Sequence, residues 1–122
     1  MGSTNKTLDP ETTGQLMTRL AKVLDQQCRQ RQTLTYLQAA DAIAVPGPWR
    51  IHKTTRLLER LLRQDLIDGR PPRSALVVSR QGTGLPADGF FDRAQRLGAF
   101  DGADPAAFHA RILEQLFVEP GR

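Results

Sequence analysis

The sequence has few of the residues from which catalytic and metal centres are most often built. It contains one cysteine, Cys28, and two histidines, His52 and His109, which lie far apart along the chain. One cysteine cannot form an internal disulfide, and these three residues do not have metal-ligand spacing. Together with scattered carboxylates they form no acid–base constellation, so we expect no enzyme, no cofactor and no metal.

Long apolar runs are also missing. No stretch approaches the roughly 20 residues that a transmembrane helix needs, and the first residues, MGSTNKTLDPETTG, contain no apolar core of a secretory signal. By default these absences predict a cytoplasmic protein. The 122 residues, 39% hydrophobic and 25% charged, are typical of one globular domain. We expect that domain to span residues 9–122, after a disordered start at residues 1–8.

Helical patterns fill the first half of the chain. Asp9 and Pro10 make an N-cap and first-turn pair, and a helix over about residues 10–30 follows from apolar residues at helical spacing, namely Leu16, Leu20, Val23, Leu24 and Cys28. Thr35 and Gln38 have capping-box spacing and begin a short second helix. The Pro-Gly-Pro at 46–48 ends it, and a third helix is expected over about residues 49–68. Two helices joined by a tight turn predict a helix-turn-helix.

The second half changes character. Val77 and Val78 are the β-branched centre of a predicted strand over residues 75–79, and residues 81–84 are a predicted turn. Residues 85–90 are either a partner strand or an irregular loop, and this element would form a wing. Helices are expected over residues 91–97 and 105–117. The expected fold is therefore mainly α with a small β element, a winged helix-turn-helix with flanking N- and C-terminal helices.

Basic residues are unevenly distributed. The net charge is +4, and residues 46–80 hold eight Lys or Arg against three Asp or Glu. At 100° per residue, the core face of the third helix is expected to hold Ile51, Thr54, Leu58, Leu61, Leu62 and Asp65, with Asp65 near its exposed end. The opposite face carries a basic row of Lys53, Arg56, Arg60 and Arg63, with Arg50 at its edge.

Such a row favours a polyanionic partner. Cations four residues apart on a helix repel one another by a few tenths of a kcal/mol, whereas each cation that neutralises a phosphate releases counterions and adds affinity. We therefore expect DNA binding, with Arg80 of the predicted wing as a secondary contact; a solvated face and an acidic protein partner are the alternatives. His52 is expected to be solvated or hydrogen-bonded rather than a ligand. Trp49 is expected to fill the junction between turn and core, with stacking on nucleic acid as the alternative.

The segment LTYLQAADAIAVPGPWRIHKTTRLLERL resembles the helix-turn-helix of the C-terminal domain of O6-alkylguanine-DNA alkyltransferases and alkyltransferase-like proteins. Thr35-Tyr36 and Ala40 match the start of that motif, and Pro46 and Arg50 match its turn and arginine. The similarity extends over about residues 34–98. It implies that Tyr36 lies against a DNA phosphate and that Arg50 enters the stack where a base is flipped out. The segment ALVVSRQGTGLPADGFF also resembles one found in small bacterial proteins without an assigned activity.

The chain departs from the family at the reactive position. The family's Pro-Cys-His-Arg run falls on Arg73-Ser74-Ala75-Leu76, and a serine without a nearby base is not an activated nucleophile. The sequence therefore predicts a non-catalytic DNA-binding protein, regulatory or DNA-surveillance in type. The alternative is a protein-interaction module or dimeric adaptor, in which the basic row meets an acidic partner and the apolar last helix forms a homodimer surface.

Overall fold

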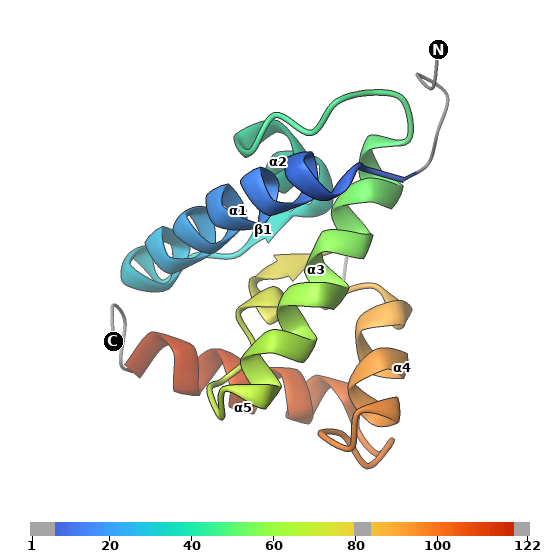
Figure 1. The fold of residues 1–122 in the computed structure, drawn as a ribbon. Helices are drawn as coiled ribbons and strands as arrows, with labels where there is room; N and C mark the ends of the chain where they lie inside the picture. Colours follow the sequence, from blue (N-terminus) through green and yellow to red (C-terminus); the bar gives the residue numbers. More distant parts are fainter. Residues whose placement is uncertain (1–6, 80–83, 119–122) are drawn as a thin grey trace.

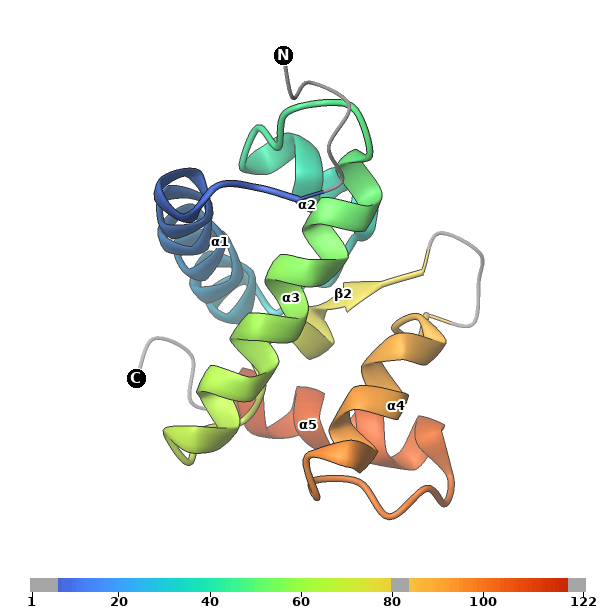
Figure 2. The same ribbon diagram turned by 45° about the vertical axis from the view of Figure 1, so that its right-hand side comes forward.

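The computed structural model describes residues 7–79 and 84–118 and is mainly helical, with one small sheet (Figure 1). Its elements in chain order are α1 (Pro10–Gln30), β1 (Leu34–Thr35), α2 (Tyr36–Ala42), α3 (Arg50–Ile67), the 3-10 turn η1 (Arg73–Leu76), β2 (Val77–Val78), α4 (Asp88–Arg96) and α5 (Pro105–Val118). The mostly α class with a small β element is thereby confirmed. Helix α3 runs through the centre, with α1 and α2 on one side and α4 on the other, and α5 passes beneath its C-terminal end (Figures 1 and 2).

The helix starts follow the local chemistry predicted from the sequence. Asp9 caps α1 by accepting a hydrogen bond from the Thr12 N–H at 2.7 Å. Thr35 and Gln38 form a complete capping box, since the Gln38 N–H donates to Thr35 Oγ1 at 3.2 Å and the Thr35 N–H donates to Gln38 Oε1 at 2.9 Å. These bonds satisfy N–H groups that the first helical turn leaves without partners.

The β element differs from the predicted wing. Only Val77 and Val78 of the predicted strand are extended, because residues 73–76 form the 3-10 turn. The strand pairs in parallel with Leu34–Thr35, a strand that the sequence did not predict, in the register Leu34 to Val77. Leu85 belongs to a loop, and its carbonyl accepts a hydrogen bond from the Ser79 N–H at 2.8 Å. The predicted turn at 81–84 lies outside the described residues except for Gly84.

The core is continuous around α3. Leu16, Leu20 and Leu24 of α1 pack with Leu57 and Leu61 of α3, and all five are at most 3% exposed. Four phenylalanines join α4 to α5. The distance between ring centroids is 4.4 Å for Phe100 and Phe108 and 5.2 Å for Phe90 and Phe91. Leu8, which the sequence placed in a disordered start, is half-buried against this core. In the described ranges no helix combines the length and apolar character that a membrane crossing requires.

The buried arc of α3 is wider than the sequence predicted. Asp65, expected near the exposed end, is 0% exposed, and Lys53, expected on the open face, is 5% exposed. Ile51, expected to face the core, is 44% exposed. The reason is that α3 is enclosed by α1, α2, α4 and η1, so that neighbours cover it on several sides.

Candidate nucleic-acid interface on helix α3

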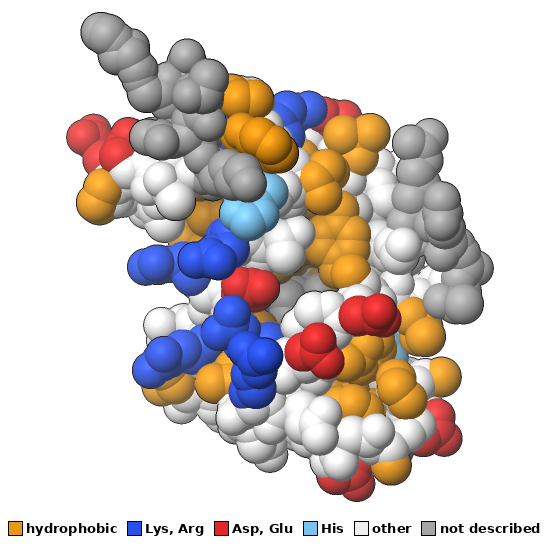
Figure 3. Space-filling model, turned by 90° about the vertical axis from the view of Figure 1, so that its right-hand side faces the viewer, with side chains coloured by type: hydrophobic (Ala, Val, Ile, Leu, Met, Phe, Trp, Pro, Cys, Tyr) orange, Lys and Arg blue, Asp and Glu red, His pale blue; other side chains and the backbone are white. Residues whose placement is uncertain are grey.

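Three arginines of the predicted basic row lie on the surface of α3. Arg56, Arg60 and Arg63 are exposed, and within the described ranges none of them forms an ion pair or side-chain hydrogen bond. Their spacing of four and three residues places them on one side of the helix. Figure 3, which views the molecule from the side of α4, shows Lys and Arg side chains gathered next to a hydrophobic strip. We call Arg56, Arg60 and Arg63 the arginine row.

The Arg50 side chain is about one-third exposed, and its guanidinium is bound to the turn that precedes α3. Its Nε donates to the Val45 carbonyl at 2.7 Å, one terminal nitrogen donates to the Ala40 carbonyl at 3.2 Å, and the other pairs with Asp41 at 2.8 Å. The guanidinium therefore holds the turn between α2 and α3 in shape. A contact of Arg50 with a phosphate or with the gap left by a flipped base would have to replace some of these bonds, and that role stays a prediction.

Lys53 is withdrawn from the surface. Its Nζ donates to the Pro46 carbonyl at 3.1 Å, and α1 and the N-terminal segment cover its side chain. Lys53 therefore joins Arg50 beside the turn, on the concealed side of α3. The prediction that it shares the exposed row is wrong because the helix packs on that side as well.

Tyr36 and Arg80 complete the predicted contacts. The Tyr36 hydroxyl accepts a hydrogen bond from the Ala87 N–H at 3.0 Å, which ties α2 to the residue before α4. Burial raises the pKa of Tyr36, and the bond from Ala87 opposes that shift in part. Tyr36 is half-buried and lines a hollow. Arg80 lies outside the described residues.

That hollow lies between α3, α4 and η1 and has a volume of about 100 Å³. Its walls are mostly apolar and are formed by Tyr36, Thr55, Leu58, Glu59, Leu62, Ser74, Ala87, Gly89 and Phe90. Ser74 is 4% exposed, and its Oγ has no hydrogen-bond partner among the described residues. A buried hydroxyl without a partner costs free energy unless something else meets it. We call this space the Ser74 hollow.

One ion pair crosses the space between α3 and α4 beside the Ser74 hollow. Arg93 donates to Glu59 Oε1 at 3.1 Å. The pair ties α4 to α3, and the Tyr36–Ala87 hydrogen bond ties the residue before α4 to α2. The partner of Glu59 therefore lies 34 residues away in the sequence and not one turn along α3.

Exposed apolar residues lie near the start of α3. Trp49 is 49% exposed and Leu37 is 42% exposed, and Ile51 is similarly open. The expectation that Trp49 fills the core is therefore wrong: its backbone adopts φ 64° at the helix entry, and the indole lies partly in solvent. His52 is exposed, as predicted.

A cluster of buried charges around Arg73 and Asp65 belongs to the scaffold. Arg73 donates from its backbone N–H and its terminal nitrogen to Asp65, both at 2.8 Å, and reaches Asp25 of α1 at 3.2 Å. Burial disfavours the charged form of Arg73, but the bonds and charges of the two carboxylates outweigh it and raise its pKa. Arg70 adds longer contacts to the same carboxylates. This cluster fastens η1, and with it Ser74, to α1 and α3.

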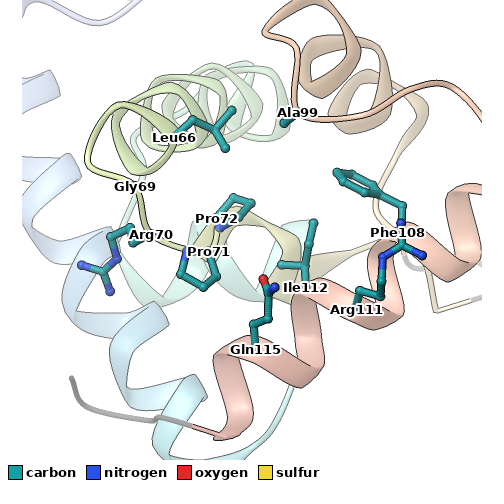
Figure 4. A pocket seen from close by; sticks show the side chains of 10 residues that line it. All are labelled: Leu66, Gly69, Arg70, Pro71, Pro72, Ala99, Phe108, Arg111, Ile112 and Gln115. Carbon is teal, nitrogen blue, oxygen red and sulfur yellow. The ribbon is translucent and has the colours of Figure 1, made fainter.

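A recess of about 490 Å³ lies at the C-terminal end of α3. Figure 4 shows Arg70 at one end, directed toward α1, and Arg111 at the other, with Pro71, Pro72 and Ile112 between them. Its two cations diverge rather than converge on one point. The described residues contain no group of three or more His, Cys, Asp or Glu that could hold a metal ion. Cys28 is buried, which raises the pKa of its thiol, and His109 lies 2.8 Å from the Ala75 carbonyl in the core.

Comparisons with known proteins add no relative. No protein-family model matches the chain, and no curated protein or solved structure matches it.

Proposed function

We propose that this chain is a non-catalytic DNA-binding protein, of regulatory or DNA-surveillance type, in which α2 and α3 act as the helix-turn-helix of a winged-helix-like domain. The observation that supports this most directly is the arginine row. Three exposed guanidiniums stand on one side of α3, and the one carboxylate that the helix places next to them, Glu59, is engaged by Arg93. Arginine suits this position because its planar fork binds phosphate oxygens in pairs.

A salt titration tests the proposal quantitatively. If each member of the arginine row neutralises one phosphate, the log–log slope of affinity against salt is about −2.7, or about 0.9 for each contact. Affinity then falls about 40-fold between 50 and 200 mM salt. Fluorescence anisotropy with a labelled duplex measures this directly, and a flat salt dependence contradicts the proposal.

A matched pair of triple variants separates the arginine row from net charge. Arg56→Gln, Arg60→Gln and Arg63→Gln together should remove most of the slope. The control combines Lys22→Gln, Arg29→Gln and Arg111→Gln, which are exposed cations of α1 and α5. It loses the same charge and should retain the wild-type slope, because distant charges act only through a field that salt screens.

The Ser74 hollow supports the surveillance form of the proposal. By the family resemblance, Ser74 occupies the place of the reactive cysteine, and its unpartnered hydroxyl lies in a hollow that holds about three waters' volume, enough for a small alkyl group. Recognition of an alkylated base requires tighter binding to a duplex carrying O6-alkylguanine than to the plain duplex. Ser74→Val, which replaces the hydroxyl with a methyl group and adds a second methyl group to the hollow, should abolish that difference while leaving the salt slope unchanged.

The alternative, a dimeric adaptor formed through the last helix, has less support. Phe108, Ile112 and Leu116 of α5 are buried against their own chain, so most of the apolar face that suggested a dimer is already used. Light scattering over a range of concentrations distinguishes the two functions. A stable dimer together with no affinity for duplex, single strand or RNA would favour the adaptor.

A further inference from the structure

A second hollow, of about 160 Å³, lies on the other side of α3 from the Ser74 hollow. Figures 1 and 2 show the segment that leads into α1 crossing α3 at this level. The hollow is lined by Thr7, Leu8, Thr13, Lys53, Arg56, Leu57 and Arg60. Three of these side chains are cations, two carry hydroxyls and none is acidic. We call it the Lys53 hollow.

Lys53 is the unusual member of this set. Its side chain is 5% exposed, and the contact that the structure gives its ammonium is one carbonyl, that of Pro46 at 3.1 Å. Among the described residues no carboxylate lies within ion-pair distance of it. A buried ammonium has three N–H donors, and withdrawing it from water without a counter-charge is costly. Folding has therefore placed a cation where an anion would relieve the cost.

The neighbours of Lys53 show what kind of anion fits. Arg56 and Arg60 contribute fork-shaped donors, and the Thr7 and Thr13 hydroxyls contribute single donors. A carboxylate has two acceptor oxygens, whereas a phosphate group presents three or four and carries more charge. The volume corresponds to about five waters, which leaves room for one phosphate group.

We propose that the Lys53 hollow binds a phosphate group, through Lys53, Arg56 and Arg60. The inference rests on the proposed function, because the expected source is one phosphate of the DNA backbone next to the arginine row. A free phosphate has the same chemistry, so the experiment has one arm for each source.

The first arm uses inorganic phosphate alone. Melting temperatures of the full chain are measured in a few millimolar phosphate and in chloride of equal ionic strength, because a ligand that binds only the folded state raises the melting temperature. Wild type and Lys22→Gln, a loss of one exposed charge on α1, should show the same rise. Arg60→Gln should reduce the rise, and Lys53→Met should abolish it. Arg60 is exposed, so its variant tests the hollow even if Lys53→Met does not fold.

An equal rise in all four proteins overturns the inference, because it would be the general stabilisation that phosphate salts give to folded proteins. The absence of any rise in wild type also overturns it.

The second arm repeats the DNA titration with Lys53→Met and Arg60→Gln. A smaller salt slope in Lys53→Met and in Arg60→Gln than in Lys22→Gln identifies a backbone phosphate as the occupant. A phosphate-induced rise in a protein that does not bind DNA supports the hollow with free phosphate as its ligand and removes the proposed function. DNA binding with a slope near −2.7, together with no phosphate-induced rise in melting temperature, supports the proposed function and overturns the inference that the Lys53 hollow binds phosphate.

Discussion

Asp65 should be among the residues on which folding most depends. It is a charged residue, and the sequence pattern placed it near the exposed end of the core face of α3. It is 0% exposed and accepts hydrogen bonds from the Arg73 backbone N–H, Nε and a terminal nitrogen, at 2.8, 3.2 and 2.8 Å. We consider Asp65→Asn, which keeps the size of the side chain and removes its charge. Arg73 then remains buried, and its closest carboxylate is Asp25, at 3.2 Å.

The expected loss follows from the burial of both partners. Breaking a buried pair by removing one charge costs about 3–5 kcal/mol, and the remaining Asp25 contact places this variant near the lower end, about 3 kcal/mol. Unfolding entropy of about 2.1 cal/mol/K per residue over 122 residues converts each kcal/mol into about 4 °C. The melting temperature should therefore fall by about 12 °C, and urea titration followed by circular dichroism should give the same loss in free energy.

Two comparisons make this result interpretable. Asp68→Asn changes an exposed carboxylate three residues later, whose contact is a 3.1 Å bond from Gln64, and should alter stability by less than about 0.5 kcal/mol. Asp65→Leu combined with Arg73→Met removes both charges and should recover much of the loss, since apolar replacement of a whole buried pair is often neutral. If Asp65→Asn costs less than about 1 kcal/mol, the argument that this pair fastens η1 is refuted.

Two further predictions concern α2. Thr35→Ala removes the acceptor of the capping box and should cost about 1 kcal/mol in urea titration, whereas Thr33→Ala, in the exposed segment before it, should cost less than about 0.5 kcal/mol. Burial raises the pKa of Tyr36, so this tyrosine ionises at lower pH in the unfolded chain than in the folded protein. The stability that the neutral hydroxyl contributes is fully present below the ordinary pKa of 10.0, and it is lost as pH rises through the higher folded pKa. Tyr36→Phe should therefore reduce the alkaline loss of stability measured in parallel urea titrations, and an unchanged alkaline slope would contradict the assignment.

The parts of the fold that sequence predicted are those set by neighbours in the chain. Helix α1 occupies residues 10–30 as expected, because its cap and its apolar spacing are both local. The same holds for the capping box of α2 and, within one residue at each end, for α3. The pairing of Leu34 with Val77 was missed because two-residue strands have no period, and their partners lie 43 positions apart.

The site was predicted less well because exposure depends on what packs against a helix. A helical-wheel projection separates the two faces of α3, but it cannot show that α1 covers Lys53 while Arg56 stays exposed to solvent. It also cannot show that the turn folds back so that the Val45 and Ala40 carbonyls meet Arg50. The Ser74 hollow requires α3, α4 and η1 together, and the sequence indicated Ser74 only through the family resemblance.

The packing that buries Lys53 also gives the proposed interface two distinct sides. Adjacent positions of α3 serve different hollows: Thr55 and Glu59 line the apolar one at Ser74, and Arg56 and Arg60 line the cationic one at Lys53. A nucleic-acid strand has the same division, with charge along its backbone and apolar faces on its bases. A purely acidic protein surface would match the Lys53 side and leave the Ser74 side empty. The arrangement of two unlike hollows across one helix therefore favours DNA over an acidic protein more strongly than the basic row does alone.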